Sequence, residues 1–115
     1  MGGDAVAKTV LGEFEHQVLL AALRCRGEAY SVPIVLELEQ RTGRKVAPAA
    51  VYIALRRLEE KGLAQSSLRS PTGEQGGRSR RYVRVTDEGV AQLRESKRRF
   101  LNLWEGLDPV LEKGR

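Results

Sequence analysis

The sequence predicts a mainly α-helical fold with a small β-hairpin, a winged helix-turn-helix that carries a C-terminal dimerisation helix. Three amphipathic segments, each followed by a glycine, occupy residues 12–62. Two arginine-rich, strand-like runs then flank a segment of turn formers, and a long segment with a three-and-four apolar spacing follows. We expect a flexible arm over residues 1–10, the winged helix-turn-helix over 11–86, and the dimerisation helix and tail over 87–115, all in one compact unit.

The composition favours a nucleic acid as the partner. The chain has 115 residues, which suits one domain with a modest core, and a formal net charge of +5. Cys25 is the only cysteine, so an intrachain disulfide is excluded and a reducing compartment is expected. Neither a signal peptide nor a membrane-spanning apolar run is recognisable, and we expect a cytoplasmic protein.

The first two predicted helices supply much of the core. The first begins near Gly12, with Glu15 placed for a capping box, and ends at Gly27. Its apolar stripe consists of Phe14, Val18, Leu19, Ala22 and Leu23. The second covers residues 31–41, with Ser31 as its expected cap. Its inward residues are Ile34, Val35 and Leu38.

The third predicted helix, residues 48–61, carries the candidate DNA-reading surface. Winding it at about 100° per residue places one set of residues inward, namely Val51, Ala54, Leu55 and Leu58. The opposite face carries Ala49, Tyr52, Ile53, Arg56 and Arg57. Pro48 and Ala49 would allow a close approach to the major groove, and the two arginines would contact a guanine edge or a phosphate. An ordinary solvated face would look similar, but the basic hairpin that follows favours DNA.

The hairpin forms the predicted wing. Its arginines, which face only Glu74 in sign, are Arg69, Arg78, Arg80, Arg81 and Arg84. Strand alternation places Val83 and Val85 inward and Arg80, Tyr82 and Arg84 on the other face. Three glycines at the tip, Gly73, Gly76 and Gly77, would let it follow a DNA backbone or minor groove. Arg78 and Arg80 are the expected contacts; a solubilising turn is the alternative.

The last predicted helix is capped by Thr86 and ends at Pro109, or passes into a short turn from Asp108. Its apolar residues are Val90, Leu93, Phe100, Trp104 and Leu107. Such spacing is typical of a seam between helices, which predicts a homodimer that presents two recognition helices to a palindromic operator. Trp104 is also a candidate contact for a flat hydrophobic effector at the interface. Packing of the same residues on the chain's own core is the alternative.

The sequence offers no catalytic or metal site. His16 is the only histidine and Cys25 the only cysteine, so one chain can form neither a metal cluster nor a Cys-His pair. We therefore expect no enzyme activity and no cofactor. Cys25 should pack as a small hydrophobe, because redox sensing would require exposure and a lowered pKa.

Several motifs resemble the PadR family of bacterial transcription regulators. They are Leu11-Gly12-Glu13-Phe14-Glu15 with Val18-Leu19, and the segments 38–46, 48–63, 76–82 and 85–89. The short tail is similar to the smaller subfamily. The resemblance implies a homodimeric repressor that leaves its operator when an effector arrives. It also implies that the helix over 48–61 reads the major groove with Tyr52 at the DNA face, while the wing contacts the backbone. Some small members bind flat hydrophobic compounds between tryptophans of the last helix, where Trp104 lies. Ala47 departs from the family, which often has a capping serine there.

The predicted function is sequence-specific binding of double-stranded DNA, most simply as a repressor. Two alternatives stay open. In the first, the main activity is the binding of a small hydrophobic molecule at the dimer interface, reported by Trp104. In the second, the basic surface docks an acidic protein, and DNA binding would then be weak in its dependence on salt.

Overall fold

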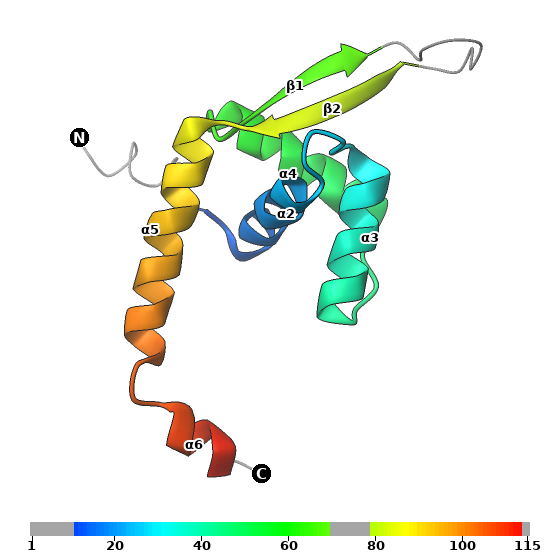
Figure 1. Cartoon of the computed structure of the whole chain (residues 1–115). Coiled ribbons are helices and arrows are strands. Elements are labelled where there is room, and N and C mark those ends of the chain that lie inside the picture. The colour runs from blue at the N-terminus through cyan, green and yellow to red at the C-terminus, as the bar shows by residue number, and fades with distance from the viewer. Residues whose placement is uncertain (1–10, 70–78, 114–115) are drawn as a thin grey trace.

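The structure is a computed structural model that describes residues 11–69 and 79–113. The predicted arm at residues 1–10 and the hairpin tip, with its glycines and Arg78, lie outside the described residues. The elements in chain order are α2 (Glu13–Arg24), α3 (Ser31–Thr42), α4 (Pro48–Glu60), β1 (Ala64–Arg69), β2 (Arg80–Val85), α5 (Asp87–Trp104) and α6 (Asp108–Lys113). Figure 1 shows α2, α3 and α4 packed together, with the hairpin beside them. The predicted fold class, a helical winged helix-turn-helix with a small hairpin, is confirmed.

The core lies among α2, α3, α4 and the base of the hairpin. Its most enclosed large side chains are Val18, Leu19, Ile34, Val51, Leu58 and Leu63. The predicted inner face of α4 is confirmed, since Val51, Ala54, Leu55 and Leu58 are all buried. Leu23 corrects the prediction for the first helix, because its side chain is 43% exposed instead of lying in the core.

The N-terminus of α2 is held by a buried charge. The Gly12 amide donates to Glu15 Oε1 at 3.0 Å, as expected for half of a capping box. The Lys61 ammonium, just after α4, lies 2.6 Å from the same oxygen. Burial acts to raise the pKa of Glu15, but the hydrogen bonds from Lys61 and Gly12 and the charges of Lys61 and Arg57 outweigh it and lower this pKa. The pair therefore ties α2 to α4.

Two helix ends differ from the predictions. α2 ends at Arg24 and not at Gly27, although Gly27 does adopt a left-handed φ of +85° in the loop that follows. Ser31 is the first residue of α3 and does not cap it; Tyr30 stands at the N-cap position, and no side chain of the described residues caps this end. The predicted stop at Gly43 is confirmed by its φ of +71°.

The hairpin is antiparallel, with a register that runs from Ala64 opposite Val85 to Arg69 opposite Arg80. Val83 is 5% exposed and its amide donates to the Ala29 carbonyl at 2.7 Å. The loop between α2 and α3 is thus bonded to β2. Since Arg80 and Arg84 are exposed on the other face, the predicted alternation is confirmed.

Thr86 joins α4, the hairpin and α5. Its hydroxyl accepts from the Gly89 amide at 3.0 Å and donates to the Gly62 carbonyl at 2.8 Å, which confirms the predicted cap. Gly89 packs directly against the chain that follows α4. A Cβ at this position would overlap the Leu63 carbonyl oxygen and come within 2.8 Å of Val85 Cγ1, so only glycine fits.

The end of the last long helix corrects the prediction. α5 stops at Trp104, and Gly106 with a φ of +83° turns the chain before α6 begins at Asp108. Leu107 therefore lies between the helices and does not extend the apolar series of α5. In Figure 1 the last turns of α5 and all of α6 lie away from α3 and α4. No helix in the described ranges is long and apolar enough to cross a membrane.

Candidate nucleic-acid interface

The outer face of α4 is open to solvent. Tyr52 and Ile53 are 53% and 51% exposed, and the other predicted DNA-contact residues of this helix, Pro48, Ala49, Arg56 and Arg57, are exposed as well. Ala47 precedes the helix in an extended conformation and has no side-chain oxygen to cap it. The amides of the first turn thus meet no bulky side chain from their own N-cap. A helix end of this kind can approach a DNA groove closely.

Arg56 is held in place on that face by Tyr52, one turn earlier. Its Nη1 donates to the Tyr52 hydroxyl at 3.1 Å, and the guanidinium lies 5.9 Å from the centre of the ring. The hydrogen bond to Tyr52 raises the pKa of Arg56, so this group is charged at any working pH. Arg57 does not share this arrangement, because its charge lies near Glu15 and lowers the pKa of that carboxyl.

Arg80 is held by two tyrosines at the base of the hairpin. Its Nη1 donates to the Tyr30 hydroxyl at 3.1 Å, and its guanidinium lies 4.6 Å from the centre of the Tyr30 ring. Tyr82 and Tyr30 raise the pKa of Arg80. Tyr30 is packed edge-on against Tyr82, with the ring centres 5.3 Å apart.

The other hairpin arginines have partners within the fold. Arg69 lies over the Tyr82 ring at 3.7 Å and donates to the Gly27 carbonyl at 2.8 Å. Arg81 donates to the Ser66 hydroxyl at 2.9 Å, and Arg84 donates to the Gln65 side chain on β1. Arg78 is in the segment outside the described residues, so its predicted contact stays a prediction.

The structure brings Tyr52, Arg56 and Arg80 together around one cleft. This cleft, which we call the α4–β2 cleft, has a volume of about 240 Å³ and lies between the outer side of α4 and strand β2. It is lined by Tyr30, Tyr52, Arg56, Glu59, Arg80 and Arg81, among others. The three arginines and one glutamate give it a net positive lining. A surface of this charge between a helix and a hairpin suits a DNA backbone.

The predicted dimerisation residues divide into two groups. Leu93 is 6% exposed and packs into the core of its own chain, and Val90 is half-buried, so the alternative interpretation holds for Leu93. Phe100 and Trp104 are each 50% exposed, and Leu107 is 43% exposed. An apolar groove of about 450 Å³ between α2 and α5 borders the exposed set, with Leu20, Leu23, Phe100 and Leu101 in its walls.

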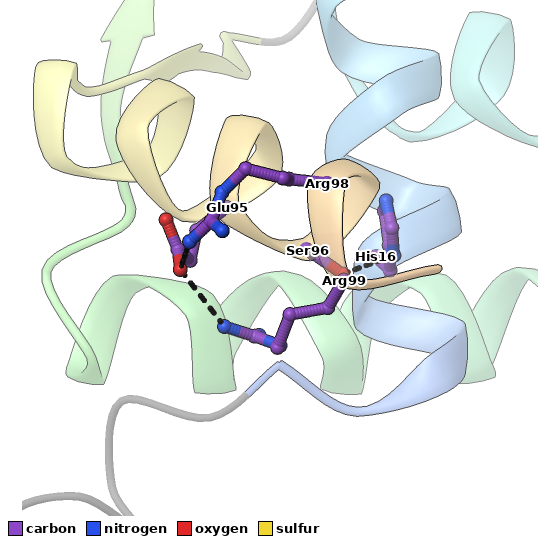
Figure 2. Close-up of polar contacts among 5 residues, drawn as sticks. All are labelled: His16, Glu95, Ser96, Arg98 and Arg99. Atoms are coloured by element: carbon purple, nitrogen blue, oxygen red, sulfur yellow. Dashed lines mark hydrogen bonds and ion pairs between the residues drawn. The ribbon is translucent and has the colours of Figure 1, made fainter. Parts of the chain in front are cut away.

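One polar contact joins α2 to α5 beside this groove. His16 Nδ1 and Ser96 Oγ are 3.2 Å apart, and the His16 ring lies 6.2 Å from that of Phe100. Burial lowers the pKa of His16. Figure 2 shows this contact together with Glu95, which pairs with Arg98 and Arg99 on the outer side of α5.

Cys25 is half-buried and packs against the core, and its pKa is raised by burial and by the charge of Glu37. A raised pKa is the opposite of what a reactive thiol requires. In the part of the chain that the structure describes, His, Cys, Asp and Glu side chains form no group that could hold a metal ion.

Sequence reasoning missed Tyr30 and the structural role of Arg69. Tyr30 contacts Arg80 from fifty positions away, and Arg69 contacts Gly27 from forty-two. Periodicity within one element carries no signal for such pairs. The exposed leucines Leu20, Leu101 and Leu103 were also missed, although they extend the same apolar surface as Phe100.

Comparisons with known proteins agree with this architecture. The sequence matches the transcriptional regulator PadR-like family over residues 19–95, more than half of the chain. A PadR family transcriptional regulator from Eggerthella lenta is 33% identical, with a TM-score of 0.66, and the alignment covers 83% of this chain and 80% of that one. A PadR-like regulator from Bacillus cereus is 22% identical, with a TM-score of 0.67 and coverage of 85% and 90%. A PadR family regulator from Clostridium difficile is 21% identical, with a TM-score of 0.63 and coverage of 84% and 97%. No curated protein matches the sequence.

Proposed function

Because the chain belongs to the PadR-like family of transcriptional regulators, we propose that it binds a specific sequence in double-stranded DNA with the outer face of α4 and the hairpin. The observation that carries this proposal is the exposed row on α4, with Tyr52 and Ile53 both about half exposed, next to a cleft lined by arginines from both elements. Apolar side chains this open in a small domain are suited to a partner surface. Here α4 would enter the major groove while the hairpin contacts the backbone.

The protein acts as a homodimer in this proposal. The exposed side chains of α5 and α6 include Phe100, Leu101, Leu103, Trp104, Val110 and Leu111, each at least half exposed in a single chain. They continue into the apolar groove between α2 and α5. A twofold partner would cover this surface and would place two copies of α4 on an inverted repeat.

Occupation of an operator by such a dimer would repress transcription, and release would follow the binding of an effector. Trp104 is the candidate contact for a small hydrophobic effector, since it is half exposed at the end of α5. A ligand sensor whose main activity is this binding is the second candidate function. It predicts that flat hydrophobic compounds quench the fluorescence of Trp104, the only tryptophan.

Selection of bound duplexes from a randomised DNA pool at near-physiological salt tests the proposal. We expect enrichment of an inverted repeat whose half-site centres lie about ten base pairs apart. Recovery of no motif, with binding that fades as salt rises, would reduce the arginines to non-specific phosphate contacts. Absence of DNA binding altogether would instead favour an acidic protein as the partner of this surface.

A further inference from the structure

The α4–β2 cleft contains two arginines that approach it from different elements and are both held by tyrosines. Arg56 comes from α4 and donates to Tyr52, whereas Arg80 comes from β2 and donates to Tyr30, each at 3.1 Å. Both pairs line the same cleft of about 240 Å³. A guanidinium carries five N–H groups, so each arginine keeps most of its donors for a ligand. Each tyrosine hydroxyl that accepts from an arginine also keeps its own proton to donate.

The chemistry of the cleft favours a phosphate. Paired guanidinium groups bind phosphate oxygens with charge-assisted hydrogen bonds, and arginine geometry suits bidentate contacts. Ser31, the first residue of α3, also lines the cleft, so the N-terminal end of a twelve-residue helix faces it. The partial positive charge of that end adds to the attraction for an anion. Glu59 is the one acid in the lining, against three arginines.

Arg80 is supported from behind by a chain of contacts. Tyr30 packs on Tyr82, and Tyr82 is covered by Arg69, which is itself fixed to the Gly27 carbonyl. Both strands and the loop between α2 and α3 therefore contribute to the position of Arg80. A side chain ordered before binding loses less conformational entropy when it meets its ligand. Arg56 has a similar but more local support from Tyr52, on the same helix.

We propose that the α4–β2 cleft is a phosphate clamp, in which Arg56 and Arg80 bind one and the same backbone phosphate of the bound duplex. Tyr52 and Tyr30 are positioning residues that hold these two arginines. The clamp rests on the proposed function and sharpens it, because it makes Arg56 a backbone contact and leaves base reading to the N-terminal part of the outer face, around Ala49 and Ile53. It also fixes the hairpin base and α4 to a single point on the DNA backbone.

Affinity measured against salt tests the clamp, with the selected operator and a random duplex as the two probes. The variants are Arg56→Gln, Arg80→Gln and the double variant, and Arg99→Gln on α5 is the control that removes one charge outside the cleft. Each cleft variant should weaken binding to both duplexes by the same factor, roughly tenfold. The slope of log K against log salt should fall by about 0.9, the value for one phosphate. Arg99→Gln should leave the slope almost unchanged.

Sharing of one phosphate makes the two losses non-additive. The double variant should lose clearly less affinity than the product of the single losses, and its slope should fall by about 0.9 and not by twice that amount. Losses that multiply, with a doubled change in slope, would show two separate phosphates and overturn the clamp. A loss confined to the operator in Arg56→Gln would make Arg56 a base contact, which also overturns it.

The role of Tyr30 is tested by Tyr30→Phe, which removes the hydroxyl and keeps the ring. We expect weaker binding to both duplexes in the otherwise unchanged protein, an unchanged melting temperature, and no further effect in the Arg80→Gln background. Equal effects in both backgrounds would exclude positioning through Arg80. These results are separate from the fate of the proposed function, since a protein that binds no duplex at all contradicts that function, whereas a clamp failure appears only in a protein that binds DNA.

Discussion

His16 is the residue through which pH should reach the fold. Burial lowers its pKa, so the unfolded chain takes up the proton more readily than the folded one. Stability from the neutral imidazole is therefore fully present above its ordinary pKa of about 6.5 and is lost as the pH falls from there toward the lowered value of the folded state. We predict that His16→Gln is less sensitive to acidification between about pH 7.5 and 5 than the unchanged protein.

Urea unfolding at a series of pH values measures this effect. Glutamine can still bond with Ser96 but does not titrate, so the comparison isolates the charge. Identical pH profiles for the two proteins would show that His16 is not buried at the junction of α2 and α5. The Glu15–Lys61 pair acts in a different window, because its lowered pKa protects stability above the ordinary glutamate value of 4.5 and loses it only as the pH falls further.

Gly89 is a second residue whose environment decides the outcome of a substitution. Alanine in place of glycine within a helix usually stabilises it by about 1 kcal/mol. Here a Cβ would overlap the Leu63 carbonyl oxygen, which belongs to the backbone and cannot swing aside. Overpacking of this kind costs about 1–3 kcal/mol, so we predict that Gly89→Ala destabilises the protein. An increase in the urea midpoint would contradict the close packing of α5 on the chain after α4.

At the scale of the element, α4 begins without a cap. Ala47 lies in the extended conformation that a capping residue adopts, but it offers no oxygen to the amides of the first turn. We predict that Ala47→Ser raises the free energy of unfolding by about 1 kcal/mol, measured with urea. Ala49→Ser, inside the first turn, is the matched control and should not stabilise. Equal effects of the two serines would mean that the N-cap position of α4 is not at residue 47.

The faces of α4 could be predicted from the sequence because they depend on local periodicity. Val51 and Leu58 are buried and Tyr52 and Ile53 exposed, as a helix of 3.6 residues per turn requires. The end of α5 was predicted wrongly because apolar spacing was followed past a break. Gly106 was the available signal, since a glycine one or two residues beyond a helix commonly ends it with a left-handed φ.

The environment of Arg80 could not be predicted in this way. Its partners Tyr30 and Tyr82 come from the start of α3 and from the hairpin, and their meeting depends on how the hairpin docks on the loop at Ala29. The sequence marked Arg80 as a basic residue of a wing. Only the packing of whole elements shows that it stands opposite Arg56.

At the scale of the whole molecule, the exposed apolar surface of α5 and α6 predicts self-association. We predict that the double variant Phe100→Asp/Trp104→Asp sediments as a monomer, because it places two charges on side chains that are each half exposed. Leu36→Asp, at an equally exposed leucine of α3, is the control and should leave the dimer intact. A dimer that survives the double variant would move the interface elsewhere. Leu93→Asp is unsuitable for this test, since Leu93 belongs to the core and its loss would unfold the chain.

The central claim is that the outer face of α4 reads bases in a symmetric operator. The most direct measurement is selection from a randomised duplex pool with the unchanged protein and, side by side, with Ile53→Ala, whose target side chain is 51% exposed and not needed by the core. The account predicts an inverted repeat in both selections, with the preference at one position of each half-site relaxed in the variant. The same motif, unchanged at every position, would contradict base reading by this face of α4.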